Sequence, residues 1–215
     1  MADETPLNPN ELVLRQALLS DLDKLIYISR ECFLDHLRWR SYMPVGKRWW
    51  RAVLESNGNR TWIAEDDGRI WAFFTVVFDL DAWRASAKKR MGGTAVRLAS
   101  ALCCPVPAVW ARSLRNSFLG FFNKKVIRYN QVTFKSGRTA WAELMGILPS
   151  MRNKGFGSRL LREVEQKSLA EGAAFMEGHI DTRNTSSRKV FEKNGFVLIF
   201  ESVRGCNYKK RLLSE

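Results

Sequence analysis

The sequence predicts a mixed α/β fold, in which helices flank a mostly antiparallel central sheet and a basic helical insertion separates the third and fourth strands. Three observations predict it. Short β-rich runs alternate with segments of helical periodicity, as in a mixed sheet. Two of the runs meet at Asp66-Asp67-Gly68, a strong hairpin signal. Residues 80–130 differ from the rest of the chain in their excess of basic residues and in the glycines and prolines that interrupt them. We expect a disordered stretch over 1–10 and a single domain over 11–215 that contains the insert.

The N-terminal third supplies a strand, two helices and a hairpin. Residues 11–16 alternate apolar and polar side chains, as a half-buried strand does. Ser20 precedes apolar residues at helical spacing that continue to Phe33, which predicts a capped helix. A second helix is expected over 46–56, before Asn57-Gly58-Asn59. The β-rich runs of 61–78 form the hairpin.

The C-terminal part alternates strands and helices again, with glycines at the ends of the helices. The expected elements are strands over 131–134 and 139–148, a helix over 157–171, a strand over 173–180, a helix over 185–194 capped by Asn184, and strands over 196–203 and 207–213.

Composition excludes several classes of protein. With 46% hydrophobic and 27% charged residues in 215, the chain can form a packed core. No run approaches the roughly 18 apolar residues of a membrane span. The N-terminal residues have no basic-then-apolar signal pattern, so a cytoplasmic protein is expected. The four cysteines show no C-x-x-C pair, and His36 and His179 have no metal-ligand companions. We therefore expect reduced thiols and no metal site.

The net charge of +13 is concentrated in one segment. Residues 81–130 hold ten basic residues against Asp81 alone, and so carry +9 of that charge. Trp110, Leu114, Phe118 and Phe122 form an apolar stripe at helical spacing there. Three interpretations stay open: a lid or homodimer element, a helix on an anionic membrane surface, or a nucleic-acid contact. The last is less favoured, because the aromatic residues form one stripe and do not alternate with the cations.

The stretch "PSMRNKGFGSRLL" at 149–161 places two glycines directly before a helix. Glycines let the backbone approach a ligand closely, and the helix N-terminus directs free N–H groups and a positive dipole at it. The turn therefore suits an anion such as phosphate. It is not a G-x-G-x-x-G fingerprint, because Leu160 stands at the third glycine position, nor a P-loop, because no lysine follows Gly157. From the glycines alone, an ordinary strand–helix turn explains it equally well.

Two motifs together resemble a known family. The pattern P-x-x-R-x-x-G-x-G, at 149–157, resembles the acyl-CoA signature of the GNAT superfamily of N-acetyltransferases, and N-x-x-S-x-x-x-F-E-x-x-G-F, at 184–196, is similar to that family's next motif. The resemblance covers 11–79 and 131–213 and leaves out the insert. It implies a central sheet of GNAT type, acetyl-CoA or another acyl-CoA as cofactor, and acyl transfer to a primary amine by direct attack.

The resemblance also implies which residues bind the cofactor. The backbone of Met145 to Leu148 would pair with pantetheine, and one of its N–H groups would polarise the thioester carbonyl. The turn after it would hold the pyrophosphate, and the second motif would contact pantetheine. The cofactor-binding residues expected in this way are Ile147, Leu148, Arg152, Asn153, Lys154, Gly155, Phe156, Gly157, Ser158, Asn184, Ser187 and Phe191.

The catalytic groups are less clear from the sequence. Many family members carry a tyrosine that protonates the departing thiolate, but this chain has Phe191 at that position, so Tyr208 or water would supply the proton. Glu143 is the candidate base, and regular strand alternation would place it on the same face as Trp141 and Met145. A solvated or ion-paired strand carboxylate explains Glu143 equally well, and His179 is a weaker candidate base.

Two other functions stay open. A non-catalytic acyl-CoA-binding protein would keep the cofactor turn and lose the acid, as Phe191 suggests. An acyltransferase at a membrane surface, peripheral to the membrane and using a longer acyl chain, would explain the basic segment of 80–130. The identity of the acceptor amine is not indicated by any motif.

Overall fold

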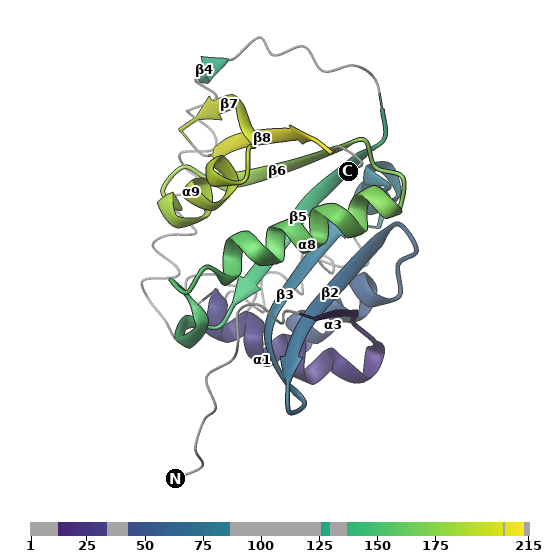
Figure 1. The fold of residues 1–215 in the computed structure, drawn as a ribbon. Helices are drawn as coiled ribbons and strands as arrows, with labels where there is room; N and C mark the ends of the chain where they lie inside the picture. The colour runs from purple at the N-terminus through teal and green to yellow at the C-terminus, as the bar shows by residue number, and fades with distance from the viewer. Residues whose placement is uncertain (1–12, 34–42, 87–125, 130–136, 204, 213–215) are drawn as a thin grey trace.

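The computed structural model describes residues 13–33, 43–86, 126–129, 137–203 and 205–212 (Figure 1). Eight strands of these described residues form one sheet. The elements are β1 (Leu14–Gln16), η2 (Leu19–Asp21), α1 (Leu22–Cys32), α3 (Met43–Leu54), β2 (Asn59–Asp66), β3 (Arg69–Val77), α4 (Leu80–Ala85), β4 (Val126–Tyr129), β5 (Thr139–Ile147), η3 (Pro149–Met151), α8 (Phe156–Ala170), β6 (Phe175–Asp181), α9 (Thr185–Lys193), β7 (Val197–Ser202) and β8 (Gly205–Arg211).

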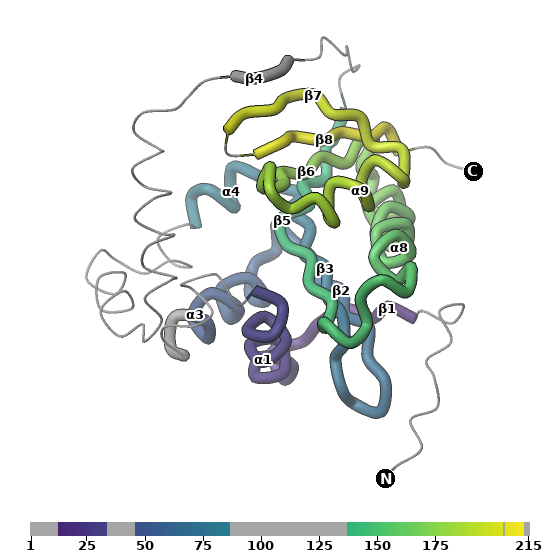
Figure 2. The backbone as a smooth tube through the Cα atoms, turned by 90° about the vertical axis from the view of Figure 1, so that its left-hand side faces the viewer, coloured from purple at the N-terminus to yellow at the C-terminus, as the bar shows by residue number. Residues whose placement is uncertain are grey.

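The sheet is mixed and mostly antiparallel, as the sequence predicts. Its strand order is β1-β2-β3-β5-β6-β8-β7-β4, and β5–β6 is the parallel pair among neighbours that are otherwise antiparallel. Helices α1 and α3 lie on one face, and α8 and α9 lie on the other (Figures 1 and 2). Among the described residues no helix is long and apolar enough to cross a membrane.

The predicted hairpin is confirmed. Asp66 pairs with Arg69, and Asp67 and Gly68 between them have φ angles of 45° and 72°. Positive φ at both central residues is the geometry of a type I′ turn, whose twist matches that of the flanking strands. The turn chemistry thus fixes the register in which β2 and β3 present their buried side chains.

The face under α1 and α3 is held by aromatic side chains. Trp50 and Phe73 are fully buried, and their ring centroids lie 5.2 Å apart. The indole N–H of Trp50 donates to the Ser29 hydroxyl at 3.0 Å, so the polar end of a buried Trp finds a partner. Phe33, at the end of α1, meets the Phe73 ring edge-on at 6.2 Å. These contacts attach both helices to β3 at the middle of the sheet.

The two ends of the predicted insert of 80–130 lie within the described residues. Two of its parts are described: α4, and β4, which pairs with β7 at the far edge of the sheet. The sequence did not indicate β4, because its four residues include Arg128 and directly follow two lysines. Residues 87–125, which include the aromatic stripe, lie outside the described residues, and so does the strand expected over 131–134.

A buried carboxylate fixes the start of the domain. Asp21 is 4% exposed, and its oxygens accept hydrogen bonds from Arg15 at 2.7 and 2.9 Å and from the Leu18 backbone N–H at 2.8 Å. Arg15 also donates to Glu65 on β2 at 2.6 Å. The hydrogen bond from Arg15 holds the pKa of Asp21 below its usual value. This cluster ties β1, η2 and β2 together.

We expect Asp21→Asn to lower the free energy of unfolding by about 1–2 kcal/mol at pH 7, because it removes charge-assisted hydrogen bonds from a buried group. The depressed pKa of Asp21 stabilises the fold fully above the unfolded value of about 3.9, and this stabilisation is lost gradually as the pH falls from there through the lower folded value, so the loss should begin to shrink below about pH 4. Urea unfolding of both proteins at pH 7 and pH 3.5 measures this, and an equal difference at the two pH values would contradict it.

Candidate functional site

The two parallel strands at the centre of the sheet separate halfway along their length. β5 and β6 pair only from Thr139 to Ala142 and from Phe175 to Gly178. Beyond these residues β5 continues to Ile147, paired with β3, and β6 continues to Asp181, paired with β8 (Figure 1). Among the described residues, one edge of each strand is thereby left without a ladder partner. We call the diverging segments 143–147 and 179–181 the two arms of the fork.

A β-bulge sits where the fork opens. Opposite β3, Thr75 pairs with Leu144 and Val76 pairs with Ala142, so Glu143 is the extra residue. Trp141 pairs with Val77 and Met145 with Phe74. Because Val77 and Phe74 are three residues apart on β3, Trp141 and Met145 lie on opposite faces. The expectation that Glu143 shares one face with both of them was wrong, because it assumed regular alternation and the bulge interrupts it.

The glycine turn lies directly after the β5 arm. Asn153 and Gly155 have φ angles of 62° and 82°, and α8 begins at Phe156. From Asn153 to Ser158, no backbone N–H has a hydrogen-bond partner in the part of the chain that the structure describes. Consecutive free N–H groups at a helix N-terminus suit an anion. The turn expected to hold phosphate therefore has the donors for it.

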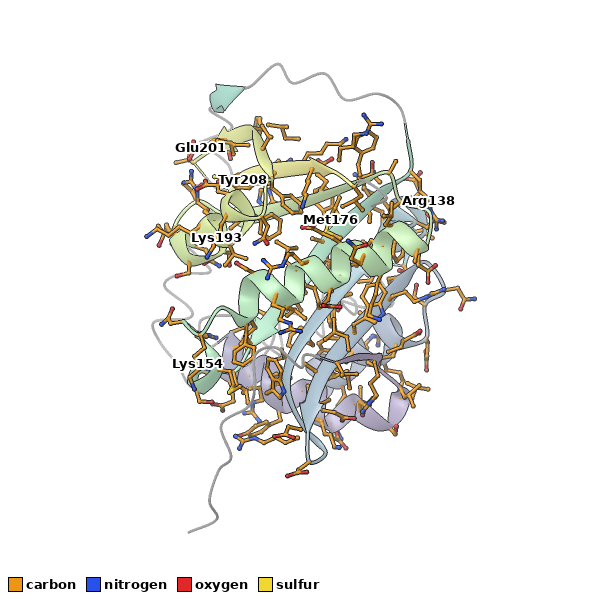
Figure 3. All side chains as sticks on the ribbon, viewed as in Figure 1. Arg138, Lys154, Met176, Lys193, Glu201 and Tyr208 are labelled. Carbon is orange, nitrogen blue, oxygen red and sulfur yellow. The ribbon has the colours of Figure 1, made fainter. Side chains whose placement is uncertain are left out.

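The Arg152 side chain is hydrogen-bonded to backbone carbonyl groups of the protein. Its Nε donates to the Ile147 carbonyl at 3.0 Å and its Nη2 to the Cys32 carbonyl at 3.4 Å. Arg152 thus connects the turn to the end of β5 and to the end of α1. Burial raises the pKa of the Cys32 thiol to about 11, so this neighbour stays a thiol near neutral pH. The exposed Lys154 remains the cationic side chain of the turn itself (Figure 3).

Helix α9 borders the fork on the α8 side. The Asn184 side-chain oxygen accepts from the Ser187 backbone N–H at 3.1 Å and caps the helix, as the sequence predicts. Phe191 is buried, with its ring centroid 4.6 Å from that of Phe196. A Cβ at Gly178 would lie 2.8 Å from Cε1 of Phe191, so the ring lies directly over this last paired residue of β6. Phe191, which stands where a tyrosine hydroxyl was expected, thus lies at the base of the fork.

Tyr208 is buried, and its hydroxyl belongs to a part-buried polar network between α9 and the sheet. Its hydroxyl donates to the Glu192 carboxylate at 2.6 Å and accepts from Nε of Arg188 at 3.1 Å, while Arg188 Nη1 donates to Glu201 at 3.1 Å (Figure 3). Burial, with the hydrogen bond to Glu192, raises the pKa of Tyr208 to about 12. Because its proton is held by Glu192, this arrangement does not support Tyr208 as the acid that protonates a thiolate.

Several residues of this region escaped the sequence analysis. The sequence analysis did not single out Arg188 and Glu192, which join α9 to the strands beneath it. Gly178 carried a usable signal, because a glycine inside a strand often marks the close approach of another group. The two candidate bases, Glu143 and His179, are the first residues beyond the last β5–β6 pair on either arm. The sequence could not show that both lie where this pairing ends.

Comparison with known proteins identifies the fold. Residues 104–196 match the model of the Acetyltransferase (GNAT) family. An N-acetyltransferase from Staphylococcus aureus Mu50 is 15% identical, with a TM-score of 0.56 over 94% of this chain and 99% of that one. The PaiA N-acetyltransferase of Thermoplasma acidophilum, solved with coenzyme A, is 13% identical, with a TM-score of 0.53 over 94% and 99%. A Salmonella typhimurium protein, YncA, solved with its cofactor acetyl-CoA, is 14% identical, with a TM-score of 0.53 over 95% of each chain. No curated protein matches the sequence.

The two glycines of the turn should respond differently to alanine. At Gly155 there is space for a Cβ, but φ is 82°, so Gly155→Ala should cost about 1 kcal/mol through backbone strain. At Gly157 a Cβ would lie 3.5 Å from Val190 Cγ2 and 3.7 Å from Ile147 Cδ1, which is ordinary contact inside a helix. Gly157→Ala should leave stability unchanged or raise it by up to about 1 kcal/mol. Urea unfolding compares the two, and equal costs would contradict the described turn.

Proposed function

We infer that this chain, which carries a GNAT acetyltransferase domain, transfers the acetyl group of acetyl-CoA to the nitrogen of a primary amine. The observation that carries the inference is that two features of the backbone follow one another along the chain. The unpaired arm of β5 leads directly into a turn whose N–H groups from Asn153 to Ser158 have no partner in the described chain. A long thioester cofactor with a pyrophosphate at one end needs both features, in this order.

The cofactor would lie along the β5 arm. Pantetheine has amide groups, so it can occupy the fork as a short extra strand and pair with the backbone around Ile147 and Leu148. The pyrophosphate would then reach the free N–H groups of residues 153–158, with the Lys154 ammonium beside it. Arg152 would act by holding the turn in place, given its hydrogen bonds to Ile147 and Cys32. Asn184 would act in part by starting α9.

The thioester would be activated by the β5 backbone. An N–H of the arm that points into the fork can donate to the thioester oxygen, and more strongly to the oxyanion that forms on attack. The bulge at Glu143 supports this role, because it interrupts the regular pairing with β3 at the first residue of the arm, directly after the last β5–β6 pair. The sheet thus exposes donors in its interior, where strands otherwise pair on both sides.

Departure of the CoA thiolate is the unusual step, because Phe191 stands where a proton-donating tyrosine was expected. The Phe191 ring lies at the base of the fork and carries no proton to give, and the Tyr208 proton is held by Glu192. A thiol has an ordinary pKa of about 8.5, so the thiolate can leave near neutral pH without a protein acid. Water, or the proton released by the new amide nitrogen, then completes the thiol. We therefore propose a transfer without a dedicated acid.

The acceptor and its surroundings stay open. The predicted homodimer, the anionic membrane surface and the less favoured nucleic-acid contact all concern 80–130, of which only 80–86 and 126–129 are described. The membrane-peripheral contact and the use of a longer acyl chain rest on the same segment, whereas the cytoplasmic location was inferred from the N-terminal residues. These remain predictions from the sequence.

A second candidate, a non-catalytic acyl-CoA-binding protein, is favoured by one observation: neither Phe191 nor Tyr208 offers a free proton to the thiolate. Release of free thiol from acetyl-CoA, measured against a panel of primary amines, separates the two. Amine-dependent thiol release with formation of the acetylated amine supports transfer. Tight binding of acetyl-CoA with no turnover of any amine would favour the binding protein.

Gly157→Val should abolish binding of CoA, because the larger side chain fills the space in which the backbone meets the pyrophosphate. Titration calorimetry with CoA measures this, with Gly157→Ala as the matched variant that tests a Cβ alone. Circular dichroism must show that the valine variant is folded. A folded Gly157→Val protein with unchanged affinity would remove the turn from the cofactor site.

Glu143→Gln should lower kcat/KM by about 10²–10⁴-fold if the carboxylate assists deprotonation of the acceptor ammonium. The substitution keeps the shape of the side chain and removes its charge. Affinity for acetyl-CoA should stay unchanged, since the expected pyrophosphate site is at the other end of the arm. Rates equal to those of the unaltered protein across pH 6–9 would exclude Glu143 from the mechanism.

A further inference from the structure

The base of the fork is closed on the face of the sheet that carries α8 and α9 (Figure 2). Gly178 is the last residue of β6 to pair with β5, and its partner is Ala142. A Cβ at Gly178 would lie 2.8 Å from Cε1 of Phe191, 3.1 Å from Cζ of the same ring and 3.3 Å from Cβ of Ala142. The first distance is shorter than real Cβ contacts, so the ring packs directly onto the backbone. At this point there is no space even for a methyl group.

The Phe191 ring is held by the core around it. It is 5% exposed and belongs to the hydrophobic core. Its centroid lies 4.6 Å from that of Phe196 and 6.0 Å from that of Tyr208, and both of these residues are buried. Rings packed in this way keep one rotamer, because a protein interior has few voids into which they could turn. The base of the fork is thus bounded by a rigid apolar wall.

Polar contacts fix the helix that carries this ring. The Tyr208 hydroxyl donates to Glu192 at 2.6 Å and accepts from Arg188 Nε at 3.1 Å, and these two partners are one turn apart on α9. Arg188 also donates to Glu201 of β7 at 3.1 Å. Phe191 directly precedes Glu192 in the chain. One hydroxyl of β8 therefore holds the helical turn from which the ring projects.

The acyl group would be the part of the cofactor nearest to this wall. In the proposed function the pyrophosphate meets the turn of 153–158, which follows the end of the β5 arm that is farther from Ala142. Pantetheine runs from the pyrophosphate along the arm, and the thioester with its acyl group comes last. The acyl group therefore points toward the end at which β5 and β6 close, and it meets the Phe191 ring there on the α9 side.

A longer acyl chain would have to turn toward the opposite face of the sheet, which carries α1 and α3 (Figure 2). The Phe73 ring already covers the β5 arm on that face, because any Cβ at Gly146 would overlap with it. Since Phe191 and Ala142 close the α9 side at the base, this face is also where an acceptor amine can reach the thioester. A chain that turned there would occupy the path of the amine. Both faces thus favour a short acyl group.

We propose that Phe191 limits the donor to acetyl-CoA and similarly short acyl-CoAs, with Tyr208 as its positioning residue. The proposal rests on the function inferred above and explains its choice of acetyl, where the sequence left a longer acyl chain open. For every acyl group the amine nitrogen forms the C–N bond and the C–S bond breaks. Of the three ammonium protons, one stays on the amide, one reaches the sulfur and one goes to solvent. Phe191 changes none of these steps and decides which acyl groups fit beside the amine.

The test is the ratio of kcat/KM for butyryl-CoA to kcat/KM for acetyl-CoA, measured with an amine that the unaltered protein acetylates. The unaltered protein should favour acetyl-CoA by about 10-fold or more, because one methylene group in an apolar site is worth about that factor. Phe191→Leu keeps an apolar side chain and removes the ring edge over Gly178, so it should raise the ratio by about 10-fold or more. A ratio within about twofold of the unaltered value, or an unaltered protein that prefers butyryl-CoA, would overturn the proposal.

Phe196→Leu is the matched control. Phe196 packs against the Phe191 ring, but the atoms nearest to a Cβ at Gly178 belong to Phe191 and Ala142. Phe196→Leu should lower stability and keep the ratio, and a shift equal to that of Phe191→Leu would show a general loosening of the core and overturn the proposal. Phe191→Tyr keeps the ring, so it should also keep the ratio, whatever its hydroxyl does to departure of the thiolate. If circular dichroism shows that Phe191→Leu is unfolded, Phe191→Met replaces it with the same expected ratio.

Tyr208→Phe tests the positioning role. It keeps the ring that packs against Phe191 and removes the hydroxyl that joins Arg188 to Glu192. The turn of α9 is then held less firmly, so the ratio should rise in the same direction as in Phe191→Leu, and by less because the Phe191 ring remains. A purely structural role would lower stability and leave the ratio unchanged, as in Phe196→Leu. An unchanged ratio in Tyr208→Phe would therefore exclude Tyr208 as the positioning residue.

Failure of this inference can be told apart from failure of the proposed function, because titration calorimetry with acetyl-CoA and butyryl-CoA needs no amine. If the unaltered protein binds acetyl-CoA and acylates no amine, transfer is excluded. The ratio of the two affinities, in the unaltered protein and in Phe191→Leu, then decides the role of Phe191 in the same way. If the unaltered protein acetylates an amine and Phe191→Leu keeps both ratios, transfer stands and only the limit on chain length falls.

Discussion

The parting of β5 from β6 is the constraint on which the rest of the structure depends. A parallel pair in the middle of a sheet ordinarily hydrogen-bonds along its whole length, and separating it leaves backbone groups that need another partner. Here the pair ends at Ala142 and Gly178, while the outer edge of each arm stays bound to β3 or β8. The molecule thus has polar backbone at its centre and a rigid strand behind each arm. A ligand with amide groups is the natural partner.

Contacts on both sides of the sheet hold the arms apart. On the β5 side, the bulge at Glu143 interrupts the regular pairing with β3. The arm also packs closely against the aromatic cluster, because any Cβ at Gly146 would overlap with the Phe73 ring. On the β6 side, Phe191 lies over Gly178, and the Tyr208–Arg188 network joins α9 to the outer strands. Each half of the sheet is therefore packed against its own helices, and this packing sets the space between the arms.

The sequence predicted the order of elements well, because periodicity and turn chemistry are local signals. The Asp67-Gly68 hairpin and the Asn184 cap both lie where the residues indicated. The glycine turn was also readable, since positive φ and free N–H groups follow from glycine next to a helix start. The bulge at Glu143 could not be predicted from the sequence, because it is visible only in how β5 pairs with β3. The pairing of His179 with Asn207, 28 residues apart, likewise depends on how β6 meets β8.

The central claim is that an acyl-CoA occupies the fork and the turn together, and amide hydrogen exchange with and without CoA tests it most directly. The N–H groups of residues 153–158 have no partner in the described chain, so they should exchange fast in the free protein. Bound CoA should slow exchange both in this turn and in the arm of 143–147, and leave the β6–β8 ladder unchanged. Protection confined to other segments, or no protection at saturating CoA, would contradict the account.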